Sequence, residues 1–141
     1  MPTVTPYLNF DGDCEEAFEF YRSVLGGDFL DVSRYSEMPP DVPTSPDSAE
    51  KIMHIALRLE DGQAIMGADR PPGLGQTTSG DSVSVSIAPD SAEDGRRIFE
   101  GLSAGGQVTM PYERQFWGAD FGMCTDRFGI DWMVNYDASS E

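Results

Sequence analysis

His54 is the single histidine of this 141-residue chain, so any chemistry that needs an imidazole must use it. It lies in residues 53–60, a run of strand-forming residues that an Asp-Gly pair separates from a second such run, residues 63–69. Asp-Gly between two such runs predicts a hairpin with a two-residue turn, and in that register His54 lies opposite Asp69. A carboxylate there could orient the imidazole as a general base, which makes His54 and Asp69 the candidate catalytic residues.

Two alternatives to this catalytic pair stay open. His54 could simply complete a hydrogen bond on a polar sheet face. Cys124 could instead act as a nucleophile beside His54, although acidic neighbours would raise the pKa of its thiol and leave little of the reactive thiolate. The residues therefore assign no reaction.

Alternation along the strands predicts which side chains share the sheet face that carries His54. Arg58 lies on that face by the same register, and the first strand presents Tyr7 to it. Such an arginine would bind an anionic group, whereas a site for a cationic compound would rely on aspartates such as Asp69. Trp117 could stack on a ligand or anchor a buried loop. The candidate ligand-binding residues, a mixture that suits a small polar or amphipathic ligand, are Tyr7, Asn9, His54, Arg58, Ser84, Trp117, Cys124 and Met133.

The elements that would position these residues occur twice along the chain. Residues 14–25 and 92–103 each place apolar side chains at helical spacing, and a Gly-Gly pair follows shortly after each run. Asp13 with Glu16 predicts a capping box for the first helix, and Ser91 predicts the cap of the second. Strands are predicted at residues 3–10, 28–35, 53–60 and 63–69, and again at 81–88, 107–112, 120–125 and 130–136. The chain is therefore a tandem repeat of a strand-helix-three-strand unit.

Composition limits the partners and the compartment. A formal net charge of −16 repels phosphate backbones and anionic membranes, so neither nucleic acid nor a membrane is an expected partner. Two cysteines far apart suggest no disulfide framework, and no apolar run reaches membrane-spanning length. The N-terminus opens into a strand pattern without a signal segment, so we expect a cytoplasmic protein. The acidity fits a salt-adapted or high-GC host as well as a functional acidic surface.

The segments that carry a family resemblance span nearly the whole chain. They are residues 6–10 (PYLNF), 14–17 (CEEA), 20–21 (FY), 25–26 (LG), 53–56 (MHIA), 117–118 (WG), 121–122 (FG) and 126–135 (DRFGIDWMVN). These segments resemble the vicinal oxygen chelate (VOC) superfamily, which includes glyoxalase I, extradiol dioxygenases, and the fosfomycin and bleomycin resistance proteins. Within it the chain looks most like the PhnB-like branch, whose members are often labelled demethylubiquinone methyltransferase-like.

The resemblance implies an α+β fold, the glyoxalase/bleomycin resistance/dihydroxybiphenyl dioxygenase-like fold. Its tandem βαβββ modules, about 1–70 and about 81–137, would form a cupped mixed sheet within one VOC-type domain of residues 1–141. Members of the superfamily are commonly homodimers, and single cupped sheets expose edges that association can cover, so we expect a homodimer. Residues 38–46, whose prolines predict a long exposed loop, would lie in its interface.

Metal-dependent members of the superfamily bring one ligand, usually His or Glu, from the first and last strand of each module. By motif those four places correspond here to Thr5, Gly67, Ser82 and Met133, which form no usable ligand set. We therefore expect a metal-free protein. No glycine-rich nucleotide loop follows a first strand, so S-adenosylmethionine is not expected, and we predict no cofactor.

Three functions follow as hypotheses. The first is a metal-independent PhnB-like VOC protein that binds a small molecule in the sheet cavity, with no reaction assigned. The second is a drug-sequestering resistance protein of the bleomycin-binding type, in which an acidic groove captures a cationic compound. The third is a metal-dependent lyase or dioxygenase whose metal site has moved.

Overall fold

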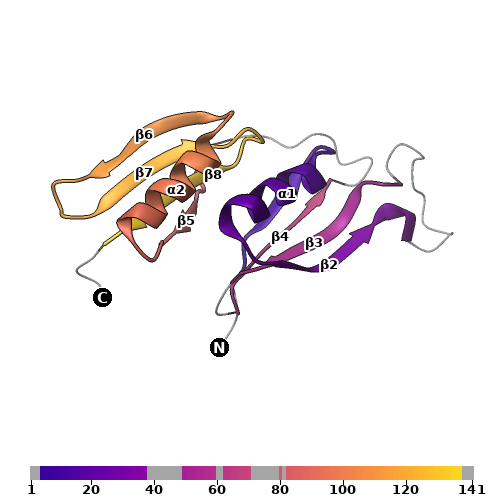
Figure 1. Cartoon of the computed structure of the whole chain (residues 1–141). Coiled ribbons are helices and arrows are strands. Elements are labelled where there is room, and N and C mark those ends of the chain that lie inside the picture. The colour runs from indigo at the N-terminus through magenta and orange to yellow at the C-terminus, as the bar shows by residue number, and fades with distance from the viewer. Residues whose placement is uncertain (1–3, 38–48, 60–61, 71–79, 81, 138–141) are drawn as a thin grey trace. The chain divides into compact units, whose positions relative to one another are not determined.

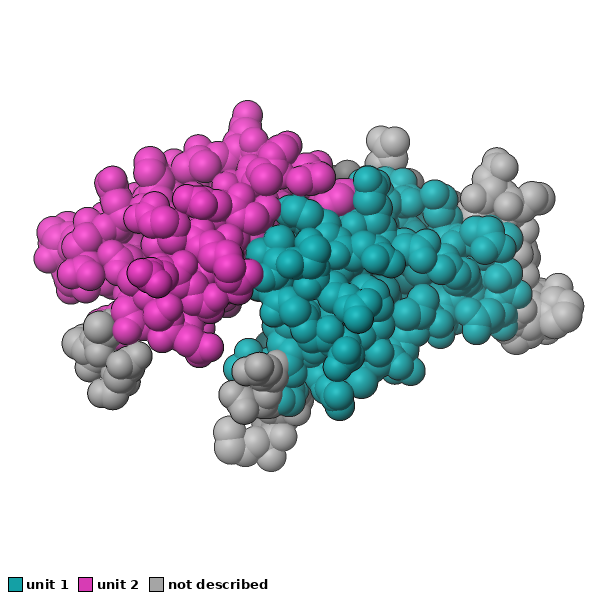
Figure 2. Space-filling model, viewed as in Figure 1, with its two compact units in different colours: residues 1–78 teal, residues 79–141 magenta. Residues whose placement is uncertain are grey.

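The computed structural model describes residues 4–37, 49–59, 62–70, 80 and 82–137, and the order of elements in its first half recurs in its second (Figure 1). The chain divides into two compact units, residues 1–78 and residues 79–141 (Figure 2). We call them module one and module two. The predicted loop at 38–46 and most of the glycine-rich connector after Arg70 lie outside the described residues.

Module one is a four-stranded sheet with one helix packed against it. Its strand order is β1-β4-β3-β2, with β1 parallel to β4 and the other neighbours antiparallel. Helix α1 buries one apolar stripe, which includes Phe18 and Tyr21, against the sheet, and burying each such side chain contributes about 2 kcal/mol. The elements are β1 (Tyr7–Phe10), α1 (Cys14–Leu25), β2 (Asp28–Arg34), the 3-10 turn η1 (Tyr35–Glu37), β3 (Ile52–Arg58) and β4 (Ala64–Asp69).

Module two repeats this arrangement. Its strand order is β5-β8-β7-β6, again with the first strand parallel to the last. Helix α2 buries Ile98, Phe99 and Leu102 and contacts β7 and β8. The elements are β5 (Val85–Ile87), α2 (Ala92–Ser103), β6 (Gln107–Arg114), β7 (Asp120–Thr125) and β8 (Asp131–Tyr136). The α+β class and the tandem βαβββ modules are therefore as predicted, and both helices have the predicted bounds.

The register of the β3–β4 hairpin differs from the prediction by one residue. Arg58 pairs with Ala64 and Ile55 with Gly67, whereas the two-residue turn required Arg58 to face Ile65. The backbone N–H of Leu59 donates to the carbonyl of Gln63 at 2.7 Å, so three residues separate the last bonded pair. Gly62, the last of the three, has φ 77°, the left-handed conformation that ends a three-residue hairpin loop.

This shift moves Asp69 to the other side of the sheet. Residues directly opposite on antiparallel strands share a face, so alternate β4 residues from Ile65 to Asp69 lie with Ile55 on the face that α1 covers. His54 and Arg58 lie on the opposite face. We call the sheet face turned away from the helix the helix-free face of each module. The predicted pairing of His54 with Asp69 is therefore wrong.

Cys124 also lies on a different face from the one predicted. It is the cross-strand partner of Trp132, and both side chains are essentially buried, at 1% and 0% exposure. Met133, by contrast, pairs with Met123 on the helix-free face. The prediction had grouped Cys124 with Met133, which the observed alternation of β7 and β8 excludes.

Candidate functional site

The helix-free face of module one brings together Tyr7 from β1 and His54 from β3. The Tyr7 hydroxyl and His54 Nδ1 lie 3.1 Å apart, within hydrogen-bonding distance, and the two ring centroids are 5.7 Å apart. Tyr7 keeps 46% of its surface exposed, and burial of the remainder raises the pKa of its phenol. The pair therefore offers a neutral hydroxyl and an imidazole at a position that solvent can reach.

Arg58 lies on the same face, four residues along β3 from His54 and so about 13 Å from it along the strand. The side chain is exposed, and its cross-strand neighbour on β2 is Asp28. Within the described part of the chain, its guanidinium makes no ion pair or hydrogen bond. Asn9, also exposed, lies on β1 beside Ala68 on this face. Of the predicted ligand-binding residues, Tyr7, Asn9, His54 and Arg58 thus share one surface.

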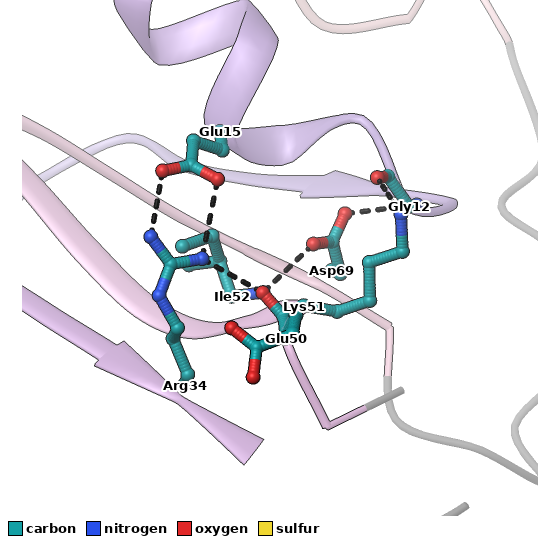
Figure 3. Close-up of a pocket in the computed structure, with 7 residues that line it drawn as sticks. All are labelled: Gly12, Glu15, Arg34, Glu50, Lys51, Ile52 and Asp69. Atoms are coloured by element: carbon teal, nitrogen blue, oxygen red, sulfur yellow. Dashed lines mark hydrogen bonds and ion pairs between the residues drawn. The ribbon is translucent and has the colours of Figure 1, made fainter. Parts of the chain in front are cut away.

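Asp69 has a structural role instead of a catalytic one. Its side chain is 2% exposed, and its two carboxylate oxygens accept hydrogen bonds from the backbone N–H groups of Gly12 (2.8 Å), Cys14 (3.0 Å) and Ile52 (2.9 Å). Figure 3 shows the carboxylate between the start of α1 and the start of β3. The first N–H groups of a helix lack intrahelical partners, so this carboxylate caps α1 from 55 residues away. The predicted cap, Asp13, makes no side-chain capping bond.

A polar pocket of about 310 Å³ lies at this corner of module one. Its lining residues are Gly12, Glu15, Arg34, Glu50, Lys51, Ile52 and Asp69 (Figure 3). Arg34 binds both carboxylate oxygens of Glu15, which holds the pKa of Glu15 below its usual value, and Lys51 Nζ donates to the Gly12 carbonyl at 2.9 Å. Because Arg34 already pairs with Glu15 and Lys51 already bonds to a backbone carbonyl, we interpret the pocket as a structural polar contact between α1, β2 and β3.

The helix-free face of module two has methionines at its centre and polar residues such as Thr125 and Asn135 beside them. Met110, Met123 and Met133 lie directly opposite one another on β6, β7 and β8. Trp117, in the loop before β7, keeps 51% of its surface exposed, so it is no buried anchor. Ser84 lies just before β5, where Ser86 pairs with Met133. Sequence reasoning singled out Met133 alone, because finding its two neighbours requires the strand register.

Neither cysteine is available as a nucleophile in the folded chain. Burial, followed by the charges of Asp126 and Asp131, raises the pKa of Cys124 to about 11. Burial and the charge of Asp69 raise the pKa of Cys14 as well. A thiol with a raised pKa and no solvent access carries almost no thiolate at neutral pH.

Gly67 is the β4 position that corresponds to a metal ligand of the superfamily. Gly67 faces the helix, and a Cβ built there would lie 2.7 Å from Cε1 of Phe18, so no larger side chain fits without rearrangement. Across the residues that the structure describes, no group of three or more His, Cys, Asp or Glu side chains could hold a metal ion. The metal-free state stays a prediction.

No described helix is long and apolar enough to cross a membrane.

Comparisons with known proteins agree with this architecture. A family model described as 3-demethylubiquinone-9 3-methyltransferase matches residues 2–135. Protein YjdN of Escherichia coli K12 is 34% identical over 145 residues, which cover 96% of this chain and 95% of YjdN. The crystal structure of protein PA1353 from Pseudomonas aeruginosa is 38% identical with a TM-score of 0.84 and covers 97% of this chain and 98% of its own. A glyoxylase/bleomycin resistance protein/dioxygenase domain from Frankia sp. EAN1pec, 17% identical with a TM-score of 0.66, covers 100% and 96% and shares the fold.

Proposed function

The chain belongs to the 3-demethylubiquinone-9 3-methyltransferase family, the PhnB-like branch of the VOC superfamily, and on this premise we propose that it binds a small anionic molecule on the helix-free face of module one. Binding would need no metal. The observation that carries the proposal is the exposed Tyr7–His54 pair, 3.1 Å apart, on the face that also holds Arg58. We further propose a homodimer and a cytoplasmic location.

Each of the three side chains can contribute a different contact. With His54 Nδ1 engaged by the Tyr7 hydroxyl, Nε2 is left for a ligand. The tautomer decides whether Nε2 donates or accepts a hydrogen bond, so the pair can adapt to either kind of ligand group. Arg58 can grip a carboxylate through two parallel hydrogen bonds. Ala56 and Ala68, both buried, lie on the same face between these polar groups.

Asp69 and Arg58 distinguish a cationic ligand from an anionic one. Asp69 was the expected receptor for a cationic drug, but its carboxylate is buried and already accepts three backbone hydrogen bonds. Arg58 is exposed and makes no ion pair or hydrogen bond within the described residues, with Asp28 opposite it on β2 and Asp31 further along the same face. Asp69 would have to lose its three backbone hydrogen bonds to bind a ligand, whereas Arg58 would lose none. Module one therefore favours an anionic ligand group.

Methyl transfer is not part of this proposal, although the family description names it. S-adenosylmethionine needs a site for its ribose, adenine and methionine parts, and the sequence carries no glycine-rich nucleotide loop after a first strand. The Tyr7–His54 pair could move a proton at a bound ligand, but its geometry specifies no reaction.

A thermal-shift and calorimetric titration with benzoate and a panel of small carboxylates tests the proposal. Arg58→Ala should weaken benzoate binding by about tenfold, the usual loss for one charge-assisted contact. Arg97→Ala, which removes the same charge from an exposed position on α2, is the matched control and should leave affinity unchanged within about twofold. Carboxylates that bind equally to wild type, Arg58→Ala and Tyr7→Phe would show that this face is not the site.

A further inference from the structure

The three methionines on the helix-free face of module two form a continuous row, which we call the methionine row (Met110, Met123 and Met133). Met110 pairs with Met123 across β6 and β7, and Met123 pairs with Met133 across β7 and β8. Directly opposed side chains have Cβ atoms about 5 Å apart, so Met123 can reach the thioether of each of its two neighbours. Met110 is 37% exposed, so the row is not part of the buried core.

Two aromatic rings extend this surface at one end. Phe121 lies two residues before Met123 on β7 and therefore on the same face. The Trp117 ring packs edge-on against Phe121 with centroids 6.0 Å apart. A tight loop presents Trp117, because the N–H of Gln115 donates to the Ala119 carbonyl at 2.8 Å and Gly118 has φ 97°. A half-exposed indole is thus held against Phe121, whose cross-strand neighbours on this face are Glu113 and Asn135.

The charges around the methionine row are negative. Glu113 of β6 lies opposite Phe121 on one side of the row, and Asp131 of β8 lies opposite Thr125 on the other side. Among the residues of module two that the structure describes, no lysine or arginine lies on this face. Arg114, the cation of β6, pairs with Asp120 on the helix side. A cationic ligand would find two flanking carboxylates, and an anionic ligand would be repelled.

We propose that the methionine row with Phe121 and Trp117 is a binding surface for a small planar aromatic cation. Thioethers adapt to the outline of a flat ring and make favourable sulfur–aromatic contacts, which suits binding surfaces that accept several related compounds. The Trp117 indole stacks on the ring and attracts its positive charge through its electron-rich face. The inference deepens the proposed function, since both treat the helix-free faces as ligand surfaces, but it assigns the opposite ligand charge to the second module.

Thioflavin T, a planar benzothiazolium cation, is the probe, and tryptophan fluorescence is the readout. Trp132 is fully buried and donates to Asp126, so quenching by a surface ligand reports mainly on Trp117. Wild type should bind the dye with quenching, and Trp117→Ala should raise the Kd about tenfold, measured by calorimetry. Met123→Thr keeps a strand-forming residue and should weaken binding by a smaller factor. Leu30→Ala, which truncates an apolar side chain of equal exposure (52%) on β2, is the matched control and should bind like wild type.

The charge of the ligand is tested with pyrene-1-sulfonate, a planar aromatic anion. It should bind far more weakly than thioflavin T to this surface, and Glu113→Gln should weaken thioflavin T binding more than Glu100→Gln, the same change on α2. Equal thioflavin T affinity in wild type and Trp117→Ala would overturn the inference, as would Trp117-dependent binding of the anion that is as tight. Benzoate affinity is measured in the same samples, because its loss in Arg58→Ala tests the proposed function independently. If only the benzoate result fails, the proposed function is wrong; if only the thioflavin T result fails, the inference about the methionine row is wrong.

Discussion

The two modules have the same fold, but they differ in how the N-terminus of the helix is capped and in which residues lie on the helix-free face of the sheet. The start of α1 is held by Asp69, a buried carboxylate that reaches it from the last strand of the module. The start of α2 is held by Ser91, whose hydroxyl accepts from the N–H of Asp94 at 3.0 Å. The helix-free face of module one carries Tyr7, His54 and Arg58, with Asp28 and Asp31 on its β2 edge. That of module two carries the three methionines and Phe121, flanked by Glu113 and Asp131, without a cation among its described residues.

The difference shows that the fold requires a helix cap but not a particular source for it. Module one uses a long-range contact that ties α1, β3 and β4 together, so its polar side chains and its stability are linked. Module two caps its helix locally, and neither of its buried carboxylates reaches the helix start. Asp126 accepts from the N–H groups of Phe128 and Ile130 in the β7–β8 turn, and Asp120 pairs with Arg114 of β6. A repeated fold can thus hold two surfaces of different chemistry.

The largest expected effect is that of removing the remote cap. Asp69→Ala leaves the buried N–H groups of Cys14 and Ile52 and the part-buried N–H of Gly12 without partners, and each buried group costs about 1–3 kcal/mol, so the free energy of unfolding should fall by about 3 kcal/mol. Asp69→Asn keeps one acceptor oxygen and should lose less. Asp31→Ala, an exposed aspartate on β2, is the control in a urea titration. If Asp69→Ala matched this control, the remote cap would have no energetic role.

The thiols of the two modules should differ in their pH dependence. A pKa raised by burial means that folding favours the protonated thiol, so the stabilisation is complete below the unfolded value near 9 and is lost as the pH rises toward about 11 for Cys124. Because the pKa of Cys14 is raised further, the stabilisation linked to its thiol is lost only at a higher pH. Between pH 9 and 11, Cys124→Ala should therefore lose less stability than wild type, measured by urea titration at each pH. Equal slopes would contradict a raised pKa at Cys124.

The local cap of module two should be worth less than the remote one. Ser91→Ala removes a single exposed hydrogen bond to Asp94, and the expected loss is about 1 kcal/mol. Ser91→Asp should restore the cap, since a carboxylate at this position also favours the helix N-terminus. A loss in Ser91→Ala as large as that of Asp69→Ala would remove the energetic distinction between the modules.

How much of this could be predicted depends on how far apart the interacting residues lie in the sequence. The bounds of both helices were predicted correctly because apolar spacing and glycine pairs are local signals, and Ser91 was identified as a cap for the same reason. Asp69 was misassigned because its partners are up to 57 residues away and no local pattern reveals them. The Asp-Gly pair is compatible with loops of two or three residues, and that ambiguity moved Asp69 to the wrong face.

The candidate site shows the same division. Tyr7, His54 and Arg58 were placed on one surface correctly, because alternation within each strand does not depend on the hairpin register. Cys124 was predicted to share the ligand face with Met133, but the register of β7 and β8 pairs Cys124 with Trp132 and Met133 with Met123. The methionine row was missed, since its members are 10 and 13 residues apart and only the bulged pairing of β6 brings Met110 opposite Met123.

The smallest expected effect is that of removing metal. We expect EDTA to leave the Tm of both modules unchanged within about 1 °C, because Gly67 and Met133 cannot serve as the ligands that a VOC metal site needs. Elemental analysis of the purified protein should find well below one equivalent of Zn, Ni, Fe or Mn. About one equivalent per chain, lost together with stability on EDTA treatment, would contradict the proposal.

Methionine methyl NMR tests the central claim, that the two helix-free faces recognise ligand groups of opposite charge, most directly. Met66 lies beside Tyr7 on the face of module one, and Met123 lies at the centre of the methionine row, so a single ¹³C-methyl spectrum reports on both. Benzoate should shift the Met66 methyl signal and leave that of Met123 in place, and thioflavin T should do the reverse. Shifts of the same methyl signal by both compounds, or a benzoate shift confined to Met123, would contradict the account.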